Sequence, residues 1–227
     1  MNPTGPIQLA ALDMAGTTVA DDGVVEEAFA QALAVVGSSP DTAVGDPLEF
    51  VRHTMGQAKI AVFTELFGGD AVTAAAANEE FEAAYGQAVD AGAVRPMPGA
   101  EAAMAALRAG GVKICLTTGF APVTRDRIIA ALGWGARVDL ALSPADAGRG
   151  RPWPDMILTA VLRLEIDDVH AVAVAGDTAS DLLAGWRSGA SVVAGVLTGA
   201  HTREQLERAP HTHVVDSVVE LPPIMLG

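Results

Sequence analysis

Four short polar segments of this chain could together carry out transfer of a phosphoryl group. They supply a carboxylate nucleophile, hydroxyl and backbone N–H groups for phosphate oxygens, a cation, and paired carboxylates suited to a hard divalent cation. In-line phosphoryl transfer to a carboxylate requires this set of groups. In chain order the segments are Asp13, Thr117-Thr118-Gly119, Arg151 within Gly150-Arg151-Pro152, and the pair Asp177 and Asp181.

The elements that must position these segments alternate between strands and helices. Apolar runs at 7–13, 112–118, 170–175 and 191–196 predict strands, and stretches with helical periodicity separate most of them. This alternation indicates an α/β fold with a Rossmann-like, mostly parallel sheet and helices on both faces. Because the carboxyl ends of parallel strands meet at one edge, we expect the polar segments to lie close together there.

One long segment interrupts the alternation. Residues 22–95 show helical periodicity and almost no strand signal, which predicts an all-helical cap inserted after the first strand. The predicted domains are therefore a core of residues 1–21 plus 96–227 and a cap of residues 22–95. The helices expected in the cap span 24–36, 47–55, 57–67 and 71–91, with a hinge at Gly56.

Composition narrows the function further. The chain has 227 residues, half of them hydrophobic, and a formal charge of −14, which disfavours nucleic acid as a partner. The single cysteine excludes an intrachain disulfide and a thiolate metal site. No signal-peptide pattern and no apolar run of membrane-spanning length is visible, so we expect a cytoplasmic protein with a small-molecule substrate and no membrane partner.

Lysine is rare in this chain, which draws attention to Lys59. The sequence has 12 arginines but only two lysines, and arginine cannot supply a deprotonatable amine. Apolar residues stand at helical spacing from Lys59, namely Met55, Val62 and Phe63. Such surroundings could keep the amine partly neutral and nucleophilic. The alternative is a solvated lysine on a helix surface.

The four segments and the place of the insertion resemble the haloacid dehalogenase superfamily of aspartate-nucleophile hydrolases. The resemblance implies that Asp13 becomes an aspartyl-phosphate and that Mg²⁺ is the cofactor. It implies Arg151 in place of the usual motif lysine. The residues expected to bind substrate or phosphate are Thr17, Thr118, Gly119 and Arg151. Those expected to hold the metal are Asp13, the backbone carbonyl of Ala15, Asp177 and, in or beside that shell, Asp181.

Ala15 departs from the usual phosphatase pattern, in which a second aspartate two residues after the nucleophile protonates the leaving oxygen. Alanine has no proton to give, so the leaving group is either poorly assisted or is carbon that departs as an enamine. Residues 55–60, read together with the core motifs, resemble phosphonoacetaldehyde hydrolases. That likeness implies that Lys59 forms a Schiff base, that Met55 packs near the amine and that a carbon–phosphorus bond is cleaved.

Three positions differ from that family's pattern. Val62, Phe120 and Gly23 stand where a histidine, a tyrosine and a cysteine are expected. The natural substrate is therefore open, and two alternatives remain: a phosphate monoester phosphatase of the same superfamily, and a catalytically silent binding protein on this fold. The family resemblance also suggests a homodimer formed through the cap.

Overall fold

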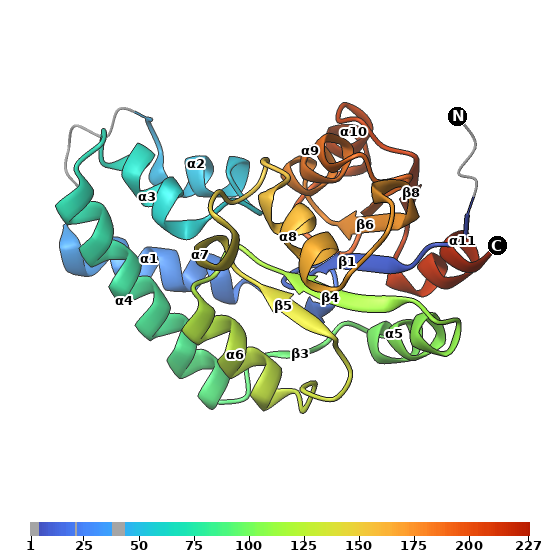
Figure 1. Cartoon of the computed structure of the whole chain (residues 1–227). Coiled ribbons are helices and arrows are strands. Elements are labelled where there is room, and N and C mark those ends of the chain that lie inside the picture. Colours follow the sequence, from blue (N-terminus) through green and yellow to red (C-terminus); the bar gives the residue numbers. More distant parts are fainter. Residues whose placement is uncertain (1–4, 21, 38–43) are drawn as a thin grey trace.

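A six-stranded parallel sheet forms the core of the molecule, with strand β1 near its centre (Figure 1). The structure is a computed structural model and describes residues 5–20, 22–37 and 44–227. The strand order is β5-β4-β1-β6-β7-β8, and every neighbouring pair is parallel, which confirms the predicted α/β class. The strands are β1 (Leu9–Asp13), β4 (Lys113–Thr117), β5 (Leu140–Leu142), β6 (Val172–Gly176), β7 (Val192–Val196) and β8 (His213–Val215).

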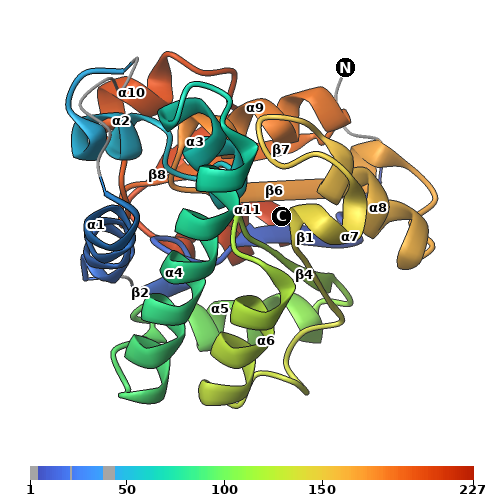
Figure 2. The same cartoon turned by 90° about the vertical axis from the view of Figure 1, so that its left-hand side faces the viewer.

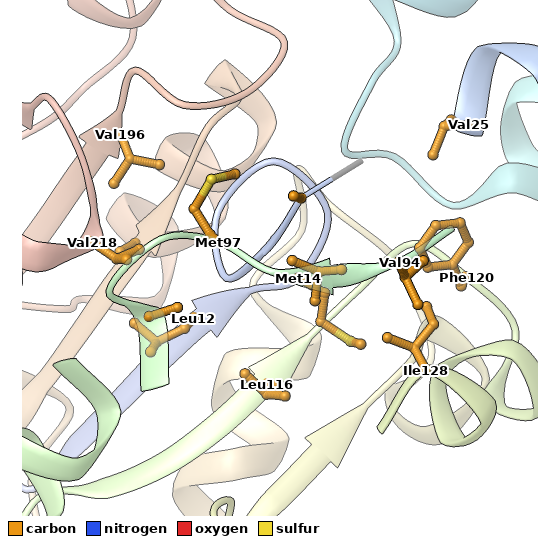
Figure 3. Packing of buried hydrophobic residues seen from close by; sticks show 14 of the residues in the cluster. Leu12, Met14, Val25, Val94, Met97, Leu116, Phe120, Ile128, Val196 and Val218 are labelled. Atoms are coloured by element: carbon orange, nitrogen blue, oxygen red, sulfur yellow. The ribbon is translucent and has the colours of Figure 1, made fainter. Parts of the chain in front are cut away.

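Side chains of β1 point alternately to the two faces of the sheet, and both faces are covered. Ala10 and Leu12 pack in the same cluster as residues of α5, α6 and α11, whereas Leu9 and Ala11 pack with α8 and α9. Figure 3 shows Leu12 near Leu116 of β4 on the first of these faces. The helices are α5 (Ala100–Ala109), α6 (Pro122–Ala131), α7 (Pro144–Ala147), α8 (Asp155–Arg163), α9 (Ala179–Ser188), α10 (Arg203–Glu207) and α11 (Leu221–Leu226).

Four helices form a second layer beyond the carboxyl edge of the sheet. Aromatic rings join α1, α3 and α4: Phe29 lies 4.8 Å from Phe63 and 4.7 Å from Phe81, measured between ring centroids. The long helix α4 runs beside α6 of the core in both views (Figures 1 and 2). The four are α1 (Val24–Val36), α2 (Pro47–His53), α3 (Lys59–Leu66) and α4 (Ala71–Asp90). Among the described residues, no helix is both long and apolar enough to cross a membrane.

A two-stranded antiparallel ribbon lies where the chain passes between the sheet and these helices. It pairs β2 (Val19–Ala20) with β3 (Arg95–Pro96), and Ala20 stands opposite Arg95. The sequence analysis predicted no strand here, because two residues are too few for a periodic pattern.

Three other differences from the predicted elements have local causes. Helix α2 ends at His53 and α3 begins at Lys59, because Gly56 adopts a positive φ of 83° that a helix cannot contain. No helix is predicted from the sequence at residues 222–223, but these prolines stand in the first turn of α11, where proline is tolerated. The expected strand at 170–175 begins only at Val172, after a 3-10 turn (Val169–Ala171).

Candidate active site

A cavity of about 520 Å³ lies at the carboxyl edge of the sheet, between the core and the cap helices. Most of the residues that the sequence analysis selected line it together, although they are far apart in the chain. They are Asp13, Ala15, Met55, Lys59, Thr118, Gly119, Arg151 and Asp177. The remaining two selected residues, Thr17 and Asp181, are buried, and neither is among the described lining residues.

Asp13 ends β1 and bonds to Arg151 across the base of the cavity. Nη1 of Arg151 donates to Oδ1 of Asp13 at 2.6 Å, and both side chains are buried. Burial raises the pKa of Asp13 to about 6, although the charge of Arg151 acts against this rise. The carboxylate is thus held in a fixed orientation and is poorly solvated, as a nucleophile toward phosphorus should be.

Asp177 follows β6 and is held by groups from two other loops. Thr17 donates its hydroxyl to Oδ1 at 3.3 Å, and the backbone N–H of Ala200 donates to Oδ2 at 2.7 Å. A Cβ atom at Gly16 would lie 2.6 Å from Oδ2, so glycine is needed for this close approach. Burial, then the charges of Asp13 and Asp181, raise the pKa of Asp177 well above its usual value.

Asp181, unlike Asp13 and Asp177, is not among the described residues that line the cavity. Its Oδ1 accepts from Nε of Arg151 at 2.9 Å, and its Oδ2 accepts the backbone N–H of Thr178 at 3.1 Å within a capping box. Arg151 therefore joins two aspartates, and its Nη2 also donates to the hydroxyl of Thr117 at 2.7 Å. Asp181 positions the arginine and caps helix α9.

The donors around Asp177 suit a divalent cation such as Mg²⁺. Among the described residues, no group of three or more His, Cys, Asp or Glu side chains is arranged to hold a metal. Mg²⁺ does not need one, because it often takes one or two carboxylates and completes its shell with water and substrate phosphates. Burial, and then the charges of neighbouring aspartates, raise the pKa values of Asp13 and Asp177, and one arginine does not balance these carboxylates. A further cation beside Asp13, Asp177 and the carbonyl of Ala15 would balance them.

The loop 118–119 after β4 contacts the segment between α2 and α3 directly. The carbonyl of Gly119 accepts the backbone N–H of Lys59 at 3.2 Å, which is the first N–H of helix α3. A Cβ atom at Gly119 would lie only 2.2 Å from the carbonyl oxygen of Gln57. Nη1 of Arg151 also reaches the carbonyl of Gly56, at 3.4 Å. The segment between α2 and α3 therefore packs against the loop 118–119 and Arg151.

Lys59 is buried, with 6% of its surface exposed, and phenyl rings surround its amine. The ring centroids of Phe120, Phe29 and Phe81 lie 5.3, 5.6 and 5.9 Å from Nζ. The alternative of a solvated surface lysine is thus wrong. Aromatic faces attract a cation, whereas burial and the N-terminal end of α3 act against one.

Three positions differ from the phosphonoacetaldehyde hydrolase pattern, and they lie in or near the wall of the cavity. Phe120 lines the cavity and packs on Tyr85, with centroids 4.5 Å apart, and Val62 is buried in the main apolar cluster. Gly23 also lines the cavity and precedes helix α1. The wall around the amine is therefore more apolar than the pattern implies.

Sequence reasoning missed two groups of lining residues. The loop 198–200 follows β7, and its position at a strand's carboxyl end was a usable signal. Asp22, Glu26 and Arg95 line the cavity near the β2–β3 ribbon, and no motif marks them. Their place depends on how the cap returns to the core.

Comparison with known families agrees with this arrangement. A sequence profile described as a haloacid dehalogenase-like hydrolase matches residues 7–189, which is most of the chain. The chain belongs to the haloacid dehalogenase-like hydrolases. The protein is therefore a hydrolase, which agrees with the buried aspartate at the end of β1.

Its relatives within the family include phosphonoacetaldehyde hydrolases. The Pseudomonas aeruginosa PAO1 enzyme is 31% identical over 230 residues, covering 92% of this chain and 81% of the relative. The Syntrophobacter fumaroxidans enzyme is 31% identical over 202 residues, covering 82% and 71%. The match to the Pseudomonas putida W619 enzyme spans little more than half of that relative, 55%.

Solved structures show the same fold with more than one assigned activity. A phosphonoacetaldehyde hydrolase-like protein from Oleispira antarctica has a TM-score of 0.82 at 23% identity, covering 97% of this chain and 92% of its own. A protein from Lactobacillus delbrueckii, assigned as a phosphoglycolate phosphatase, has a TM-score of 0.78 at 20% identity, covering 98% and 100%. At these identities the likeness concerns the fold alone.

Proposed function

We propose that this hydrolase uses Mg²⁺ and cleaves the carbon–phosphorus bond of a carbonyl phosphonate similar to phosphonoacetaldehyde. The observation that carries the proposal is that Lys59 of helix α3 and Asp13 of strand β1 line one cavity. A buried amine and a buried carboxylate facing the same space are what a substrate with a carbonyl group next to its phosphonate-bearing carbon requires. The phosphonoacetaldehyde hydrolases among the relatives support this choice.

The reaction begins at the amine. Neutral Nζ of Lys59 adds to the carbonyl carbon, and loss of water leaves an iminium. Asp13 then attacks phosphorus in line, while the electron pair of the carbon–phosphorus bond moves toward the iminium and produces an enamine with a neutral nitrogen. Protonation of the enamine carbon and addition of water release the carbonyl product and restore the amine. A second water cleaves the aspartyl-phosphate to orthophosphate.

The side chains of the core prepare this transfer. Arg151 holds Oδ1 of Asp13, and the loop 118–119 presents a hydroxyl and backbone groups to the phosphonate oxygens. Asp13, Asp177 and the Ala15 carbonyl would hold Mg²⁺, which supplies charge neutralisation for the phosphoryl oxygens when bound. Because the leaving group is an enamine carbon, no acid is needed at the position of Ala15.

A phosphate monoester phosphatase is the second candidate. The likeness of the fold to proteins assigned as phosphoglycolate phosphatases favours it. Ala15 argues against efficient ester cleavage, since general acid assistance is worth roughly 10²–10⁴ in rate. The homodimer through the cap stays a prediction, which sedimentation measurements test directly.

Borohydride reduction in the presence of phosphonoacetaldehyde tests the proposal. Mass spectrometry of the digested protein should locate a reduced adduct on Lys59, together with turnover that requires Mg²⁺. The matched control is Lys59→Arg, which keeps the charge but cannot form an imine. Absence of the adduct alongside rapid hydrolysis of phosphate esters would replace the proposal with the phosphatase.

A further inference from the structure

The cavity extends well beyond the space that a two-carbon phosphonate needs. Its volume of about 520 Å³ falls in the range of pockets that enclose drug-sized ligands. Helix α1 runs along the cavity from the end near Lys59 to the end near the β2–β3 ribbon, which we call the far end. Phe29 faces the Lys59 amine, and Val25, one turn earlier on the same face of α1, lines the cavity. Beyond Val25 the cavity reaches the β2–β3 ribbon.

The far end contains one cation. Among the described lining residues, Arg95 is the only lysine or arginine besides Lys59 and Arg151. Residue Glu26 also lines this end, but it is neutralised from outside the cavity: Nε and Nη2 of Arg52 donate to its two oxygens at 2.9–3.1 Å. The charge of Arg95 is thus the one available to a ligand here.

Arg95 is held by a contact that a ligand can replace. Its Nη1 donates to Asp22, but the side chains are 60% and 55% exposed. Exposed ion pairs contribute little net stability, so exchange of Asp22 for another anion costs little. The guanidinium has five N–H donors in a planar fork, and its preferred partner is a carboxylate.

We infer that Arg95 binds a carboxylate on the part of the substrate remote from phosphorus. The substrate class is then a carbonyl phosphonate whose carbon chain continues past the carbonyl carbon and ends in a carboxylate. Phosphorus lies at Asp13, the carbonyl carbon at Lys59, and the carboxylate at the far end of the cavity. The carbonyl chemistry rests on the proposed function, whereas recognition of a carboxylate by Arg95 does not require it.

A pair of unreactive ligands tests recognition of a carboxylate by Arg95 separately from the chemistry at Lys59. Butylphosphonate and 5-phosphonopentanoate differ by one carboxylate, and neither has a ketone or aldehyde group that can form an imine with Lys59. Calorimetric titration of the Mg²⁺-loaded protein should give a dissociation constant about 10-fold lower for the carboxylated ligand, the lower end expected for a hydrogen bond between charged groups. Arg95→Gln should abolish this preference, and Asp22→Asn, which removes the competing carboxylate, should increase it by roughly threefold.

The opposite signs of these two variants distinguish a ligand site from a structural contact. If the Arg95–Asp22 pair only stabilises the β2–β3 ribbon, both variants will change the affinity for both ligands in the same direction, and the inference is overturned. It is also overturned if the unaltered protein shows no preference. Arg149→Gln is the matched control, because Arg149 is exposed, pairs with Asp155 and is not among the described residues that line the cavity. A missing Lys59 adduct would refute the carbon–phosphorus chemistry without affecting this result.

Discussion

The two walls of the cavity hold their charged groups in different ways. On the core wall, Arg151 bonds to Asp13, Asp181 and Thr117, so each charge has a fixed direction. On the cap wall, the amine of Lys59 is surrounded by the faces of phenyl rings. The core wall fixes carboxylates around one arginine and would take a further cation, whereas the cap wall places an amine beside aromatic rings. This difference is what a reaction with separate phosphorus and carbon chemistry needs.

Removal of the nucleophile should have the largest effect and should separate the walls. Asp13→Asn keeps the shape of the side chain but cannot form an aspartyl-phosphate, so we expect phosphate release to fall by at least about 1,000-fold. The cap wall should still work, and a borohydride-reduced adduct on Lys59 should still form. Phosphate assay and mass spectrometry measure the two halves, and loss of both activities would show that the walls do not act separately.

A change at Lys59 should impair the carbon chemistry and leave the phosphorus chemistry of the core wall intact. We expect Lys59→Arg to lower carbon–phosphorus cleavage by at least about 100-fold, because a guanidinium does not condense with the carbonyl group. Any hydrolysis of small phosphate esters depends on the core wall and should change by less than about threefold. Steady-state kinetics on both substrate types make the comparison. A parallel fall in both activities would contradict the assignment of Lys59 to the carbon chemistry.

Loss of the arginine on the core wall should lower the stability of the fold. Arg151→Met leaves Asp13 and Asp181 buried without their cation, and breaking a buried ion pair in this way typically costs about 3–5 kcal/mol. Urea denaturation should show this decrease in the free energy of unfolding. Arg151→Lys is the control, since it keeps the charge but loses the fork, and it should be destabilised less.

The smallest predicted effect concerns pH and the metal. The pKa of Asp13 is raised to about 6 and that of Asp177 well above normal, so in the metal-free protein these groups destabilise the fold as pH rises through those values. Mg²⁺ must displace their protons and should bind more tightly at pH 7.5 than at pH 5. We expect Mg²⁺ to raise the melting temperature by a few degrees at pH 7.5 and by less at pH 5. Equal shifts at both values would contradict metal binding at these carboxylates.

The sequence predicted the core more completely than the cap connections. The parallel strands are apolar runs that end in polar residues, and this local pattern was sufficient to bring Asp13, Thr118 and Asp177 to one edge. The bond between Arg151 and Asp181, which keeps that carboxylate away from the cavity, joins residues from different elements. No spacing rule reports such a contact, because it depends on tertiary packing.

The cap was harder to predict for a related reason. Its helices were expected from periodicity, but the break from residue 54 to residue 58 moved Lys59 to the first position of α3. The β2–β3 ribbon places Arg95 at the cavity, and two-residue strands have no detectable pattern. Residues 38–43, between the first two predicted cap helices, lie outside the described residues.

The bond from the Lys59 backbone N–H to the Gly119 carbonyl has a consequence for any movement of helix α3. The residue that would carry the covalently attached carbon fragment is tied to the loop beside the phosphorus. Any movement of helix α3 away from the sheet must break this bond, so it would also carry Lys59 away from the loop 118–119.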